Sequence, residues 1–249
     1  MNVLVCIKSV ESEVDCDTSD YDINPYDLFA LQYGVDRKAQ FDFTITCLCM
    51  GPKKAKNVLK YCYALGADRA YLINDNVFAG SDTYATSYVI AKAINRLGNF
   101  DLIICGARTL DGETGQVPFA IAERLEMSSI SNVLEITECK KDFIVVKREH
   151  RGYKEILRGE TPSLLIFQQF AIDKPILSFM QMKKARSRVI HVLTNQELRL
   201  DVADCGLKGS LTQVLDSNRK FSMKKKNIIN GSNEEKAVKL ADLINKSIL

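Results

Sequence analysis

The residues with the clearest chemical potential lie in the stretch 103–118, which reads IICGARTLDGETGQVP. Residues 101–105 form an apolar run that is typical of a buried parallel strand, and residues 117–125 have the spacing of an amphipathic helix. A strand, a glycine-rich loop and a helix in this order are where open α/β sheets bind nucleotides, beyond the carboxyl ends of the strands. The stretch therefore predicts either a nucleotide site or a simple connection that holds no ligand.

The glycines and the start of the helix favour an anionic ligand in this loop. Gly106, Gly112 and Gly115 lack a Cβ, so the backbone can approach a ligand closely. We expect Thr114 and Gln116, with Gly115 between them, to lie at the first turn of the helix. Free N–H groups and the helix dipole favour a negative charge there.

A second loop of similar composition occurs at 79–87, AGSDTYATS, before another predicted helix. Asp82 is a favoured helix N-cap, and Thr83, Thr86 and Ser87 offer hydroxyl groups. Alone, this stretch reads as a capping sequence. Two such loops at the ends of neighbouring strands predict a crevice that holds a phosphate or diphosphate mainly through neutral donors.

The chain as a whole predicts a doubly wound, mostly parallel α/β sheet. Strand and helix patterns alternate four times along residues 2–125, and the helix after Asn24-Pro25 has a favoured N-cap and a favoured first residue. Short strands across 133–168 predict an antiparallel addition. We expect a nucleotide-binding domain at 1–168, and a partner-docking loop with a C-terminal arm and helix at 169–249.

Composition excludes several functions. A net charge of +3 over 249 residues is too small to indicate a nucleic acid partner, and no stretch approaches the roughly 20 apolar residues of a membrane span. Two distant histidines argue against zinc, and the eight cysteines read as reduced thiols of a cytoplasmic protein. Nucleophile-elbow, Walker and Gly-x-Gly-x-x-Gly motifs do not occur, so the residues predict binding without catalysis.

Several motifs occur in order along the chain: VLVCIK at 3–8, NPYD at 24–27, MGP at 50–52, ALGADRA at 64–70, the two loops at 79–87 and 105–118, and a signature across 146–166. Together they resemble one family, the β subunits of electron-transfer flavoproteins and their nitrogen-fixation-associated relatives. The similarity extends over nearly the whole chain.

The resemblance implies an electron-carrier subunit that binds FAD or AMP and works with an α subunit that carries its own FAD. The loop with Asp82 and Thr83 favours FAD here, which in one branch takes a hydride from NADH. The implied cofactor-binding residues are Cys6, Lys8, Asn24, Pro25, Tyr26, Asp27, Met50, Asp82, Thr83, Thr86, Ser87, Cys105, Gly106, Ala107, Arg108, Asp111, Gly112, Thr114, Gly115, Gln116 and Val117.

The same resemblance assigns residues 173–188 to docking on a flavin-dependent dehydrogenase, with Phe179, Met180 and Met182 as apolar contacts. A small core beneath a loop is the alternative for these three side chains. The alternative for the whole protein is a stand-alone adenine-nucleotide-binding module of stress-protein or ATP-pyrophosphatase type. A protein of the pyrophosphatase type would have Ser-Gly-Gly-x-Asp-Ser after the first strand. This chain has Lys8-Ser9-Val10-Glu11 there, which argues against that type.

Overall fold

The computed structural model describes residues 1–11, 21–213 and 228–248. The chain divides into two units, Met1–Gln213 and Val214–Leu249. In the described part of the second unit, helix α9 spans Asn233–Ile248.

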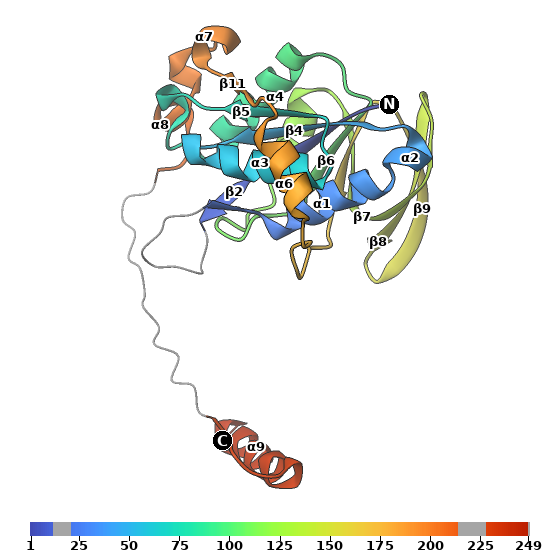
Figure 1. The fold of residues 1–249 in the computed structure, drawn as a ribbon, viewed down its shortest axis with the longest axis vertical. Helices are drawn as coiled ribbons and strands as arrows, with labels where there is room; N and C mark the ends of the chain where they lie inside the picture. The colour runs from blue at the N-terminus through green and yellow to red at the C-terminus, as the bar shows by residue number, and fades with distance from the viewer. Residues whose placement is uncertain (12–20, 214–227, 249) are drawn as a thin grey trace. The chain divides into compact units, whose positions relative to one another are not determined.

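Nine strands in the described residues form one sheet, in the order β11-β5-β4-β1-β6-β10-β7-β8-β9 (Figure 1). All neighbours are parallel except β7 with β8 and β8 with β9, so the predicted doubly wound, mostly parallel sheet with an antiparallel addition is confirmed. The strands are β1 (Asn2–Ile7), β4 (Thr44–Met50), β5 (Arg69–Ile73), β6 (Leu102–Gly106), β7 (Ser128–Cys139), β8 (Phe143–His150), β9 (Tyr153–Glu160), β10 (Ser163–Phe167) and β11 (His191–Leu193). A separate ribbon pairs β2 (Ser9–Glu11) with β3 (Tyr21–Ile23).

Helices α1 and α3 cover one face of this sheet, and α4 and α5 cover the other (Figure 1). The helices of the first unit are α1 (Pro25–Asp36), α2 (Lys38–Phe41), α3 (Lys56–Leu65), α4 (Thr83–Leu97), α5 (Val117–Arg124), α6 (Phe179–Arg186), α7 (Asn195–Leu198) and α8 (Gly206–Gly209), with short 3₁₀ turns at Lys53–Ala55, Asn76–Phe78 and Val202–Asp204.

Side chains of the central strands alternate between the two cores. Val5 and Ile104 pack beneath α1 and α3, whereas Leu4 and Ile103 pack beneath α4 and α5. Because both faces are buried, β1 and β6 need continuous apolar sequences, which is how they read in the chain.

Strand β7 joins the parallel and antiparallel parts of the sheet. Its first residues pair in parallel with β10, and from Val133 onward it pairs antiparallel with β8. The β8–β9 hairpin closes through Arg151 and Gly152, both at positive φ, as a two-residue turn between right-twisted strands requires.

Residues 169–213 pack with the first unit. Helix α6 lies beside α3 (Figure 1), where Lys60 Nζ donates to the carbonyl of Arg186 at 2.9 Å, and β11 extends the sheet by pairing with β5. The division between compact units therefore falls at residue 213, whereas the sequence predicted a boundary at 168. Contacts between segments more than 100 residues apart decide this division, and local periodicity does not report them.

Candidate functional site

The carboxyl ends of β1 and β6 are joined by the side chain of Asp27, in the first turn of α1. Its Oδ2 accepts from the backbone N–H of Lys8 at 2.8 Å, and its Oδ1 accepts from that of Gly106 at 3.2 Å. Asp27 is only 6% exposed. This burial raises the pKa of Asp27 to about 7, even though the two amide hydrogen bonds favour the carboxylate. Asp27 thus fixes the points at which both loops leave the sheet.

Gly106 is the place where helix α1 comes closest to the sheet. A Cβ on Gly106 would lie 2.5 Å from Asp27 Oδ1 and 2.6 Å from Tyr26 Cβ. The sequence predicts that a glycine here admits a ligand to the backbone. The close approach that the structure shows at Gly106 is instead to α1.

Asn24 occupies the N-cap position of α1, but its side chain makes no capping hydrogen bond, contrary to the expectation from sequence. Its Nδ2 instead donates to the carbonyl of Arg108 at 2.9 Å. Arg108 Nε in turn donates to the Tyr26 hydroxyl at 3.0 Å. The first turn of α1 is therefore used to hold the beginning of the 107–116 loop.

The middle of this loop is anchored by Asp111. Its Oδ2 lies 3.4 Å from Lys8 Nζ, and its Oδ1 accepts from the N–H of Gly112 at 2.8 Å. Partial burial opposes ionisation, yet the hydrogen bond from Thr109 and the charge of Lys8 together lower the pKa of Asp111. The ion pair between Lys8 and Asp111 thereby joins the segment after β1 to the 107–116 loop.

Helix α5 begins with its first amide groups uncapped by any side chain. Its N-cap residue, Gln116, makes no side-chain cap, and Gly115 before it has φ of +63°. Thr114, Gly115 and Gln116 therefore lie just before the helix and not in its first turn. Pro118 has no N–H, so the amides of Val117 and Phe119 are the groups that can donate to an anion at this end of α5.

Helix α4 begins differently. Asp82 Oδ1 accepts from the N–H of Ala85 at 3.0 Å, which confirms the predicted N-cap. Its Oδ2 accepts from the N–H and the hydroxyl of Thr212, each at 2.9 Å. Partial burial works against ionisation of Asp82, but these hydrogen bonds hold its pKa below the usual value.

Ser87 and the two threonines of α4 differ in their surroundings. The Ser87 hydroxyl is fully buried, donates to the Tyr84 carbonyl at 2.9 Å and accepts from Arg124 Nε at 3.2 Å. Thr83 and Thr86 are partly exposed. Asp82 and Ser87 hold the start of α4 in place, which leaves the threonine hydroxyls as the groups that face outward.

The two loops meet at the starts of α4 and α5. The Thr83 hydroxyl lies 3.3 Å from Gln116 Oε1 and donates to it. Cys6 and Met50, at the ends of β1 and β4, are partly buried against the core beneath the same two helices. The predicted site residues from β1, α1, β4, α4 and the 105–117 stretch are thus gathered at one edge of the sheet.

Two residues that the sequence did not single out help to build this edge. Thr212, 130 positions along the chain from Asp82, donates a hydrogen bond to the Asp82 carboxylate. The guanidinium carbon of Arg124 lies 4.4 Å from the centre of the Tyr84 ring. No local spacing connects residues so distant in sequence. Only the charge of Arg124 in the last turn of a predicted helix offered a signal.

Comparison with known proteins agrees with this arrangement. The sequence profile of the electron transfer flavoprotein domain family matches residues 14–198. The electron transfer flavoprotein subunit beta of Thermoanaerobacterium thermosaccharolyticum is 32% identical to this chain, over 98% of both. The chain belongs to the electron transfer flavoprotein family, with its β subunits.

Other relatives place this electron transfer flavoprotein chain in a broader group. Protein FixA of Sinorhizobium fredii is 34% identical, over 86% of this chain and 81% of its own length. The caffeyl-CoA reductase–Etf complex subunit CarD of Acetobacterium woodii is 33% identical, over 87% of both chains. The name of the second relative says that it is a subunit of a complex with caffeyl-CoA reductase.

The predicted docking residues of this flavoprotein chain lie on α6. Phe179 and Met180 are 75% and 70% exposed, and Met182 is partly buried. Ser178 and Gln181 form a capping box that fixes the start of the helix. Phe179 and Met180 are therefore presented to solvent and do not form a small core beneath the loop.

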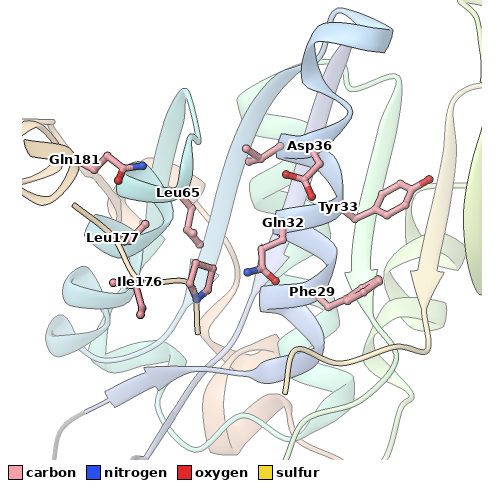
Figure 2. A pocket seen from close by; sticks show the side chains of 10 residues that line it. Phe29, Gln32, Tyr33, Asp36, Leu65, Ile176, Leu177 and Gln181 are labelled. Atoms are coloured by element: carbon pink, nitrogen blue, oxygen red, sulfur yellow. The ribbon is translucent and has the colours of Figure 1, made fainter. Parts of the chain in front are cut away.

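A cavity of about 440 Å³ lies away from the loops, between α1 and residues 175–181 (Figure 2). Gln32 and Asp36 of α1 face Leu177 and Gln181 across it. Its lining includes one carboxylate and no cation. It therefore offers little to a phosphate, in contrast to the open start of α5.

Neither a metal site nor a membrane span is found in the described ranges 1–11, 21–213 and 228–248. They contain no group of three or more His, Cys, Asp or Glu side chains placed to hold a metal ion. None of their helices is both long enough and apolar enough to cross a bilayer.

Proposed function

We propose that the crest formed by the ends of β1 and β6 and the starts of α4 and α5 binds an adenine nucleotide, FAD in preference to AMP. With an α subunit that carries its own FAD, the chain passes electrons from a flavin-dependent dehydrogenase, or from NADH, to a downstream acceptor in the cytoplasm. The flavin supplies the redox chemistry, and this chain supplies binding and orientation.

The contact between Thr83 and Gln116 carries the proposal. It brings a partly exposed hydroxyl of α4 next to the uncapped start of α5. A monophosphate needs only the amides of α5, whereas a diphosphate spans both helix starts. The proximity of the two starts is the reason to prefer FAD.

The residues present fit such a ligand. The N–H groups of Val117 and Phe119 and the residues before them would hold the phosphates, since Pro118 has no N–H. The Thr83 hydroxyl would give up its hydrogen bond to Gln116 Oε1 and donate to the second phosphate instead. Asp82 and Ser87 would position α4 without touching the ligand, because their polar atoms are already engaged within the protein. Cys6 and Met50, partly buried at the neighbouring strand ends, would lie against the adenosine part.

The relatives named as electron transfer flavoprotein subunits support the electron-carrier role over the stand-alone nucleotide-binding module. In this role, exposed Phe179 and Met180 would contact the dehydrogenase. Helix α9 would pack on the α subunit through Val238, Leu240 and Ile244, which are exposed along it. A stand-alone module needs neither surface.

The test is to co-express this chain with an electron transfer flavoprotein α subunit and to extract the purified pair with acid. We expect two FAD molecules per pair, and reduction of the flavin by NADH or by a dehydrogenase. One FAD and one AMP would support the site but reject the preference for FAD. A pair without nucleotide in this chain would reject the proposal, and ATP turnover by this chain alone would favour the stand-alone module.

A further inference from the structure

Two cysteines lie side by side at the carboxyl ends of β1 and β6. The register pairs Val5 with Ile104, so Cys6 and Cys105 follow as the next neighbours on adjacent parallel strands. Both side chains pack on the face covered by α4 and α5. The Cys6 side chain raises the pKa of the Cys105 thiol, as expected of neighbouring thiols on one face of the sheet.

The members of this pair differ in exposure. Cys6 is partly exposed, whereas Cys105 is 3% exposed. The hydrogen bond to Cys6, together with burial, raises the pKa of the Cys105 thiol well above its ordinary value. A reagent from solvent therefore meets Cys6 first, with a protonated thiol held directly behind it.

Among the described cysteines, this combination of contact and access is confined to the pair of Cys6 and Cys105. Cys47 and Cys62 also have their thiols in contact, but both are fully buried. Cys139 contacts the thioether of Met1, and Cys205 is buried next to acidic residues. Within the part of the chain that the structure describes, an oxidant therefore has a route to this thiol pair only.

We propose that Cys6 and Cys105 form an oxidation site that closes into a disulfide across β1 and β6 when a peroxide reaches it. The Cys6 sulfur, as its thiolate, attacks one peroxide oxygen and becomes a sulfenic acid; the O–O bond breaks, and the other oxygen takes up the proton that the thiol released and leaves as water. Cys105 sulfur then displaces the hydroxyl group of the sulfenic acid, and the Cys105 proton leaves with it as a second water. The two thiols together supply the two electrons that reduce the peroxide.

The spacing of the strands permits this bond. Adjacent strands lie about 4.8 Å apart, and disulfides join Cα atoms about 4.4 to 6.8 Å apart. Disulfides hold their Cβ atoms about 3.5 to 4.5 Å apart, so the two strands must move slightly together for the bond to form. The strain of this closure is expected to make the disulfide readily reduced. Its formation joins the two strands two residues before the loops begin at Lys8 and Ala107.

A consequence for nucleotide binding follows if the proposed function holds, because an adenosine group against Cys6 would cover the exposed thiol. Bound nucleotide would then protect the pair from oxidation. The oxidised chain, with the bases of its two loops linked, would hold nucleotide less tightly.

Trypsin makes the disulfide simple to identify, because it places Cys6 and Cys105 in separate peptides that contain no other cysteine. Cys6 lies in the peptide 1–8 and Cys105 in the peptide 97–108. The full chain is treated with hydrogen peroxide, remaining thiols are blocked with N-ethylmaleimide in denaturant, and the digest is read by mass spectrometry. We expect these two peptides linked, 2 Da lighter than their sum, and separated again by dithiothreitol.

Variants locate the chemistry. Cys6→Ser and Cys105→Ser should each abolish the linked peptide, whereas the control Cys205→Ser should retain it. Wild-type protein in which Cys6 is oxidised to sulfinic acid while Cys105 is still labelled by N-ethylmaleimide would overturn the proposal. So would a predominant link between any other two cysteines.

A second arm separates this proposal from the nucleotide site. The rate of disulfide formation is measured with and without saturating FAD, and again with AMP. We expect at least a tenfold slower reaction with the nucleotide that binds. A link that forms at the same rate in every case would leave the disulfide standing and overturn the protection by nucleotide.

Discussion

Helices α4 and α5 begin next to each other, but they satisfy their first amide groups in opposite ways. At α4, Asp82 accepts from Ala85, and Thr212 occupies its other oxygen. At α5, Gln116 leaves the first turn uncapped, and a glycine at positive φ precedes it. One start is closed by a carboxylate of the chain itself, and the other is open.

The difference divides the work of binding between two loops of similar composition. A carboxylate at the start of α4 already provides the negative charge that a helix dipole favours, so a phosphate there would meet repulsion. At α5 the same favourable position is free. The loop before α4 is therefore expected to contribute the Thr83 hydroxyl and a rigid side of the site. The loop before α5 is expected to bind the negatively charged phosphates.

The largest expected effect concerns Asp27, which supports the base of the α5 loop. Its pKa is raised to about 7 in the folded chain, from 3.8 in an exposed carboxyl, so the folded state keeps a proton that the unfolded state releases. Asp27 therefore makes its most favourable contribution below about pH 4, and that contribution declines as the pH rises through about 7. The decline amounts to up to about 4 kcal/mol.

Urea unfolding of wild type and Asp27→Asn between pH 4 and 8 measures this contribution. The unfolding free energy of the wild type, minus that of Asp27→Asn, should decrease as the pH rises and become constant above about pH 8. Other acids cancel in the difference because both proteins carry them. Parallel profiles would mean that Asp27 is ionised throughout and that its burial costs little.

Gly106→Ala should have the next largest effect, because Gly106 is where the loop before α5 leaves β6 and packs closely against α1. The new Cβ would lie 2.5 Å from Asp27 Oδ1 and 2.8 Å from the backbone carbonyl carbon of Tyr26, neither of which can easily move. We expect a loss of about 3 kcal/mol in unfolding free energy, as for severe overpacking, and loss of nucleotide from the purified protein.

Gly112→Ala is the matched control in the same loop. Its Cβ would meet only Thr109 Oγ1, at an ordinary 3.6 Å. Calorimetry should show a melting temperature close to that of wild type. Equal damage from both substitutions would indicate that the loop as a whole, and not the approach of α1, needs glycine.

Much of the fold could be predicted because its signals are local. Asn24-Pro25 marks the start of α1, Gly66 ends α3 at φ of +127°, and continuous apolar runs mark β1 and β6. The candidate site followed from the same strand ends, since loops after parallel strands gather at one edge of a sheet.

What could not be predicted depends on tertiary packing. The Asn24 side chain holds Arg108, 84 positions away, where its residue type predicts a cap. Thr212 donates a hydrogen bond to Asp82, and β11 pairs with β5. The loops before α4 and α5 have similar residue types, but distant residues that contact them give them different roles. The spacing of residues in the sequence does not indicate those contacts.

Gln116→Asp tests the open start directly by giving α5 the kind of carboxylate that α4 has. An aspartate at the N-cap could accept from the N–H of Phe119, since Pro118 has none, and would place a negative charge where the phosphate is expected. We expect nucleotide affinity to fall about tenfold, equivalent to about 1.4 kcal/mol. Isothermal titration with FAD and AMP measures it, and Gln116→Asn serves as the uncharged control. Unchanged affinity for both nucleotides would show that the charge lies elsewhere.

The smallest effect is expected from Asp82→Ala, the converse change at α4. Removing the cap should lower the unfolding free energy by about 1 kcal/mol, since Ala85 loses its acceptor. Thr212 loses its acceptor as well, but both of its donors lie at an exposed position that water can reach. Nucleotide affinity should stay within about threefold of wild type, because the helix start that holds the charge is untouched. If affinity instead rose tenfold or more, the carboxylate of Asp82 would be repelling the ligand, and the phosphates would extend further over α4 than its closed start allows.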